Sequence, residues 1–123
     1  MFSETGWYNT QPDGILYLGN WCLGYKGPVG ASDTLALVED TRGVANGAFW
    51  NCTNLLGSLT IPNTVITIGE RAFYNCSNLT GSLTIPNSVT TIGALAFGNC
   101  SGFNGNLTIG DGVTLIGEGA FYN

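Results

Sequence analysis

The sequence predicts a mainly β solenoid, in which the chain winds through right-handed 24-residue coils that stack on one another. Phenylalanine, cysteine and leucine each recur once per coil, always at the same spacing. The columns are Phe49, Phe73, Phe97 and Phe121; Cys52, Cys76 and Cys100; and Leu35, Leu59, Leu83 and Leu107. The 19 glycines and the low charged fraction of 9% also favour a turn-rich β architecture over disorder.

The strand of each coil is predicted from short alternating segments. Leu59 and Ile61 alternate with Ser58 and Thr60, which is the period of a strand with one face on a core and the other in solvent. We therefore expect parallel strands on one face of the solenoid, each ended by a turn such as the one at Pro62. One coil cannot bury its own apolar edge, so about three coils are the minimum for a stable stack.

Two further columns are predicted to have structural roles. A glycine precedes each strand, at Gly57, Gly81 and Gly105, where we expect a positive φ that costs glycine little. An asparagine also recurs, and stacked asparagine amides can hydrogen-bond from coil to coil. The asparagine column is Asn51, Asn75, Asn99 and Asn123.

The chain divides into two parts. Residues 1–32 do not fit the repeat, and the apolar segments 15–18 and 21–26 flank Gly19 and Asn20, which suit a two-residue hairpin turn. We expect this β-hairpin to cap the first coil, because an uncovered solenoid end exposes core. Residues 33–123 form the solenoid of about four coils, the last of them incomplete.

The repeats resemble a known family. The segments IPNTVITIGERAFYNC at 61–76, IPNSVTTIGALAFGNC at 85–100 and IGDGVTLIGEGAF at 109–121 are similar to those of the BspA-like, or Treponema pallidum type, leucine-rich-repeat family of bacterial surface proteins. Residues 6–27 also resemble a hairpin module that precedes such repeats. The resemblance implies a leucine-rich-repeat solenoid, location at the cell surface or secretion, and binding of host or neighbouring-cell proteins.

Composition excludes several functions. There is no histidine, so catalytic systems and metal sites that depend on histidine are excluded. The carboxylates are scattered, and we expect the adjacent pair Glu39 and Asp40 to lie in a solvated turn rather than in an acid/base or calcium site. Three basic residues and a net charge of −5 argue against nucleic acid as a partner. No apolar run approaches the roughly 20 residues that span a bilayer, and residues 1–4 lack the features of a signal peptide.

The cysteines are predicted to be free thiols that pack as small hydrophobes. Three cysteines at one position of successive coils point the same way and cannot all pair. A disulfide between Cys22 and another cysteine is the alternative.

Two surfaces are candidates for binding. The first is the polar strip of the strand face, which could be a concave binding surface or solvated sheet; its residues are Ser58, Thr60, Ser82, Thr84, Asn106 and Thr108. The second is an aromatic ridge formed by the residues that follow the column phenylalanines, namely Trp50, Tyr74 and Tyr122, with Gly98 interrupting it. Exposed tryptophan and tyrosine are common interface anchors, although half-buried packing would explain them equally.

The sequence thus favours a protein-binding or adhesion module of a bacterial surface or secreted protein, with no catalysis and no cofactor. The alternative is a structural spacer or self-assembly segment, in which the open C-terminal coil pairs with another copy to give a homodimer.

Overall fold

The computed structural model describes residues 14–26, 34–53 and 55–122. These residues form β-strands joined by turns, and no helix lies within the described ranges. The strands are β1 (Gly14–Leu18), β2 (Trp21–Lys26), β3 (Thr34–Ala36), β4 (Gly43–Val44), β5 (Ser58–Thr60), β6 (Thr67–Ile68), β7 (Gly81–Ile85), β8 (Thr91–Ile92), β9 (Phe103–Ile109) and β10 (Leu115–Ile116).

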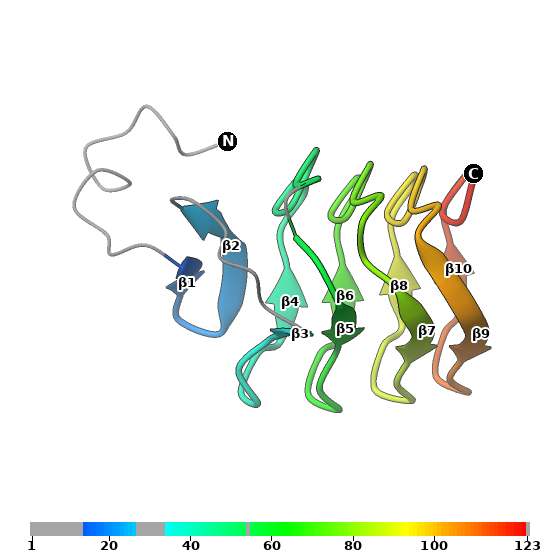
Figure 1. The fold of residues 1–123 in the computed structure, drawn as a ribbon. Helices are drawn as coiled ribbons and strands as arrows, with labels where there is room; N and C mark the ends of the chain where they lie inside the picture. Colours follow the sequence, from blue (N-terminus) through cyan, green and yellow to red (C-terminus); the bar gives the residue numbers. More distant parts are fainter. Residues whose placement is uncertain (1–13, 27–33, 54, 123) are drawn as a thin grey trace.

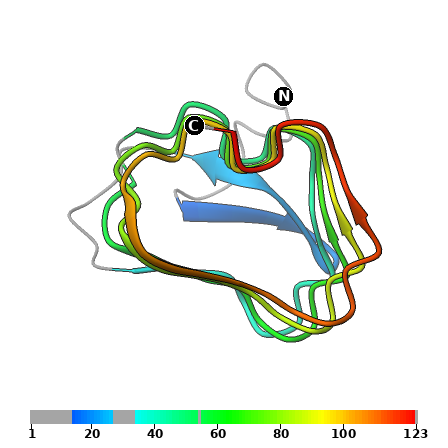
Figure 2. The ribbon, with the colours of Figure 1, turned by 90° about the vertical axis from the view of Figure 1, so that its right-hand side faces the viewer.

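The predicted solenoid is confirmed. Strands β4, β6, β8 and β10 are parallel neighbours and lie side by side along the stack (Figure 1). Their register is the repeat itself, because Ile68 pairs with both Val44 and Ile92, the equivalent residues of the coils before and after it. Viewed along the axis, successive coils lie almost on top of one another (Figure 2). Equal coil length therefore converts a sequence period into a hydrogen-bonded sheet.

Parallel strands occupy two sides of the solenoid. The strand set expected around Leu59 is present as the pairs β3–β5 and β7–β9, with Leu83 opposite Leu107. The second set consists of β4, β6, β8 and β10, each of which follows the corner after the first strand of its coil. These strands form one continuous sheet, whereas the first set is divided into two pairs. The inward residues of the second set are Val44, Ile68 and Ile92, which are fully buried. Each of these three residues thus belongs to a strand as well as to the core.

An N-terminal hairpin packs against the first coil. β1 and β2 are antiparallel, and the pair Leu18 and Trp21 encloses the expected two-residue turn. β2 also pairs with β4, so Cys22 lies opposite Val44 and extends the second sheet. Ile15 and Tyr17 pack against the buried core. Residues 1–13 and the predicted boundary at 32 lie outside the described residues, and the division into two domains stays a prediction.

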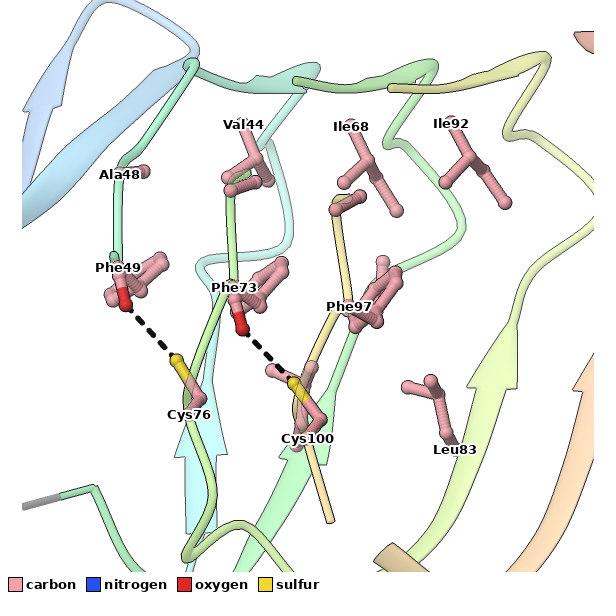
Figure 3. Packing of buried hydrophobic residues seen from close by; sticks show 14 of the residues in the cluster. Val44, Ala48, Phe49, Ile68, Phe73, Cys76, Leu83, Ile92, Phe97 and Cys100 are labelled. Carbon is pink, nitrogen blue, oxygen red and sulfur yellow. Dashed lines mark hydrogen bonds between the residues drawn. The ribbon is translucent and has the colours of Figure 1, made fainter. Parts of the chain in front are cut away.

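The third side consists of turns that carry the phenylalanine ladder (Figure 3). The rings of Phe49 and Phe73 stack with centroids 5.1 Å apart and an interplanar angle of 7°. Phe97 continues the stack at 5.1 Å, and Phe121 at 5.5 Å. These distances exceed the about 3.5 Å contact distance between carbon atoms, so the rings are offset, as expected for aromatic pairs. The amide of Phe73 donates to the carbonyl of Ala96 at 2.8 Å, which fixes the same register in the backbone.

Glycine is required for two different reasons. Gly57 and Gly81 have the predicted positive φ, 82° at each. The prediction is wrong for Gly105, which is absent from the positive-φ positions; a Cβ there would lie 2.2 Å from the hydroxyl of Ser82. Gly93 is also needed for space, because its Cβ would lie 2.5 Å from the amide nitrogen of Glu70 in the preceding coil. Close approach between coils therefore selects glycine as strongly as backbone conformation does.

The asparagine column is only partly an amide ladder. The amide of Asn75 donates to Asn51 Oδ1 at 3.0 Å, as predicted. Asn99 donates to the hydroxyl of Tyr74 instead, and Asn123 lies outside the described residues. Asn51, Asn75 and Asn99 all adopt a left-handed backbone, with φ of 59°, 62° and 54°. Asparagine tolerates this conformation better than most residues, which explains the column more fully than the amide bonds do.

Replacing Phe73 with alanine should destabilise the domain by about 3–5 kcal/mol, because the ring is fully buried between two other rings. Phe121→Ala is the matched control: Phe121 is half-buried and stacks on one ring, so its loss should cost less. Urea unfolding of the two variants measures both changes. Equal effects would mean that ring stacking contributes little.

Candidate binding surfaces

The predicted strand-face residues lie together on β5, β7 and β9. Thr60, Ser82, Thr84, Asn106 and Thr108 are exposed, and Ser58 is half-buried. Thr84 pairs directly with Thr108 across the two neighbouring strands. The Ser82 hydroxyl accepts a hydrogen bond from the backbone amide of Asn106 at 3.0 Å. The sequence thus identified which side chains share this face, because strand alternation determines it.

A shallow groove of about 500 Å³ lies on this face. Thr60, Ser82, Thr84 and Thr108 line it, whereas Ser58 and Asn106 do not. The lining also includes the apolar residues Leu59, Ile85 and Pro86, which are buried. Hydroxyl groups beside apolar residues can donate or accept hydrogen bonds with a partner, while apolar surface of the partner is removed from water.

Two asparagines that were not among the predicted residues also line the groove. Asn63 and Asn87 are exposed at the corner that follows each strand, one coil apart. Asn87 Oδ1 accepts a hydrogen bond from the amide of Asp111 at 2.9 Å, which holds this amide side chain in place. The recurrence of Ile-Pro-Asn was visible in the sequence, but only the turn after the strand brings the asparagine back to the groove.

None of the described residues that line the groove carries a charge. Its lining chemistry is therefore hydroxyl, amide and apolar, which suits a neutral partner surface or peptide backbone better than a strongly charged one.

The aromatic ridge is not uniform. Trp50 and Tyr122 are exposed, 44% and 63%, whereas Tyr74 is half-buried. Tyr74 lies over Gly98, since a Cβ on that glycine would come within 2.8 Å of the ring. Its hydroxyl also accepts a hydrogen bond from Asn99 at 3.1 Å. Gly98 therefore seats the ring of the preceding coil, and Tyr74 is a packing residue.

The cysteines are free thiols, and Cys22, Cys76 and Cys100 are buried. The expected burial is incomplete for Cys52, which is half-buried. The thiols of Cys76 and Cys100 each donate to a phenylalanine carbonyl of the preceding coil at 3.0 Å, Cys76 to Phe49 (Figure 3). This bond anchors the return of each coil to the phenylalanine turn.

Burial sets the thiol acidity. It raises the pKa of Cys22 from its usual 9.0 to about 12 and that of Cys100 to about 11, although a backbone hydrogen bond partly offsets each shift. Burial, with a smaller contribution from the neighbouring thiols, also raises the pKa of Cys76. These thiols therefore stay protonated and serve as core atoms rather than as nucleophiles.

The adjacent carboxylates of the sequence lie at the surface. Glu39 and Asp40 lie exposed in a turn, as predicted. Within the described ranges, no three His, Cys, Asp or Glu residues lie close enough together to hold a metal ion. The same residues include no helix long and apolar enough to cross a membrane.

The last described coil exposes positions that are buried in the coils before it. Leu107 is 50% exposed, compared with 4% for Leu83 one coil earlier. Ile116 is 46% exposed, although Ile92 is fully buried. A small apolar hollow at this end includes Leu107, Phe103 and Phe121.

In-register coils with parallel strands and buried ladders define the class of the protein as a leucine-rich-repeat solenoid. A family model described as BspA type Leucine rich repeat region matches residues 34–123 in 6 copies, so the chain belongs to this family. The family is typically associated with bacterial surfaces, and its repeats generally mediate protein–protein interaction as non-catalytic scaffolds. Neither the search of curated proteins nor the search of solved structures gave a match.

The buried thiols predict a loss of stability at alkaline pH. Above pH 9.0 the unfolded chain releases thiol protons, whereas the folded chain keeps that of Cys100 until about pH 11. The unfolded state then binds fewer protons, so the free energy of unfolding falls as pH rises. Urea unfolding at about pH 8 and about pH 10 tests this. A variant with Cys22→Ala and Cys76→Ala should lose less stability between these pH values, and an equal loss would assign the effect to other groups.

Proposed function

We propose that this chain is a non-catalytic protein-binding module that acts in adhesion at a bacterial surface or as part of a secreted protein. The observation that carries the proposal is the groove over the predicted strand face, where Thr60, Thr84 and Thr108 stand in a column. Membership of a family whose repeats mediate protein interactions supports the same conclusion.

The physical basis is preorganisation. Parallel strands about 4.8 Å apart hold the hydroxyl groups at fixed intervals along the stack. The backbone beneath them is tied to the next coil, so little conformational entropy is lost when a partner binds. An extended segment or flat surface of a partner protein would meet repeated donors and acceptors along the groove.

The absence of histidine from the sequence and the protonated state of the buried thiols support a non-catalytic role. The uncharged groove predicts an interaction that depends weakly on ionic strength.

A charge placed in the groove should abolish binding. We expect pull-down from solubilised extracellular-matrix and bacterial-surface extracts to yield a saturable protein partner. Thr84→Lys should weaken that interaction at least about tenfold, because the lysine would be desolvated without a counter-charge. Thr90→Lys is the matched control, since Thr90 is exposed just before β8 and outside the groove. No partner, or equal loss in both variants, would contradict the proposal.

A second candidate function is self-association through the last coil. Exposure of Leu107, Ile109 and Ile116, which occupy core positions, supports it. The opposite end is covered, because Ile15 and Tyr17 of the hairpin pack on the core there. Two copies would therefore meet through their last coils in a two-fold arrangement, rather than stack head to tail.

Light scattering over a hundredfold concentration range tests this candidate. A dimer that dissociates on dilution, and that Leu107→Lys abolishes while Thr60→Lys does not, is the expected result. A monomer at every concentration would rule out this mode of self-association.

A further inference from the structure

We propose that Trp50, together with Asn46, Glu70 and Arg71, forms a subsite for one neutral sugar ring. These four residues, here called the Trp50 site, line a surface depression of about 190 Å³ with Gly47. None of them lines the strand-face groove. The proposal therefore does not depend on protein binding at that groove.

The residue that follows one coil later differs between Trp50 and two other aromatic residues. The amide of Asn51 donates to the carbonyl of Tyr74 at 2.8 Å, which places Tyr74 beside Trp50 in the next coil. Two other aromatic rings lie on a glycine of the next coil: Tyr74 over Gly98, and Trp21 over Gly43. Trp50 has Tyr74 at the corresponding position and thus no glycine on which to lie. Trp50 is 44% exposed, close to the 45% of Trp21, so its indole is available at the surface without such a glycine.

Asn46 and the Glu70–Arg71 pair are already oriented. Asn46 Oδ1 accepts a hydrogen bond from the backbone amide of Glu70 at 2.8 Å, which leaves the Asn46 NH₂ group available as a donor. Arg71 Nη1 donates to Glu70 Oε1 at 2.9 Å. Glu70 Oε2 and the remaining guanidinium N–H groups make no further hydrogen bond within the described part of the chain. The depression thus offers planar donors and an acceptor beside one aromatic ring.

This combination matches the chemistry of a sugar ring. The C–H face of a pyranose is attracted to the negative face of an indole, and its adjacent hydroxyl groups can bond in pairs to carboxylate, guanidinium and amide groups. The ion pair balances the charge of Glu70 and Arg71, so the site favours a neutral ligand over an anion or a cation. The depression is smaller than the about 300 Å³ of a typical small-molecule pocket, which fits one ring rather than a larger ligand.

The coil that follows the Trp50 site does not repeat it. One coil further on, Ala94 and Leu95 replace Glu70 and Arg71, and neither can form a polar hydrogen bond through its side chain. Because those positions are otherwise equivalent in the solenoid, the polar groups beside Trp50 are not required by the fold. A protein partner would need a much larger buried area, about 1,000 Å² or more.

Titration with neutral methyl glycosides tests the proposal. The probes are methyl glucoside, methyl galactoside, methyl mannoside and methyl N-acetylglucosaminide. Binding is measured by ligand-observed NMR and by tryptophan fluorescence. We expect saturable binding of at least one probe with a Kd of about 1 mM, because the site is shallow and holds a single ring. Trp50→Ala should weaken it at least about tenfold, and Glu70→Gln should weaken it without changing the fold.

Tyr122→Ala is the matched control, since Tyr122 occupies the same column and is 63% exposed but does not line the depression of the Trp50 site. It should leave glycoside binding unchanged. Circular dichroism and melting curves check folding of each variant, and Glu70→Gln decides the outcome if Trp50→Ala is unstable. No saturable binding of any probe, or binding that survives Glu70→Gln and Trp50→Ala, would overturn the proposal. Loss of a protein partner in Trp50→Ala without glycoside binding would assign Trp50 to a protein interface instead.

Discussion

Equal coil length is the constraint on which the rest of the structure depends. Because successive coils have the same number of residues, the backbone donors of one coil meet the acceptors of the next on both strand faces and along the phenylalanine turns. The same period places Phe73 between Phe49 and Phe97 and lets the Cys100 thiol reach the carbonyl of Phe73. Stability is therefore a nearest-neighbour property: each coil is held by the coils on either side of it.

The two proposed surfaces use this scaffold in opposite ways. The strand-face groove repeats one chemistry, with Thr60, Thr84 and Thr108 at equivalent positions, and so suits a partner that extends along the stack. The Trp50 site arises where neighbouring coils differ, because Ala94 and Leu95 replace Glu70 and Arg71 one coil further on. Repetition builds an extended surface, and a departure from repetition creates a local site.

The candidate surfaces were predictable to different degrees. The side of the sheet on which Thr60 and Thr84 lie follows from strand alternation, so it could be read from local sequence. The contribution of Asn63 and Asn87 could not, because it depends on the turn that brings them back beside the strands. The sequence also grouped Trp50 with Tyr74, since both follow a column phenylalanine. Tyr74 is half-buried and lies over Gly98, whereas Trp50 is 44% exposed, and the shared spacing does not distinguish the two.

By itself, the sequence determined the solenoid class, the register of the coils, the phenylalanine ladder and the hairpin turn, because each arises from local alternation, turn chemistry or a strict period. Only the tertiary structure decided which glycines serve close approach rather than positive φ, as at Gly105 and Gly93. It also decided that the asparagine column adopts a left-handed backbone, and that the Tyr74 side chain is half-buried whereas that of Trp50 is exposed. These outcomes depend on atoms of adjacent coils, whose distances no local pattern encodes.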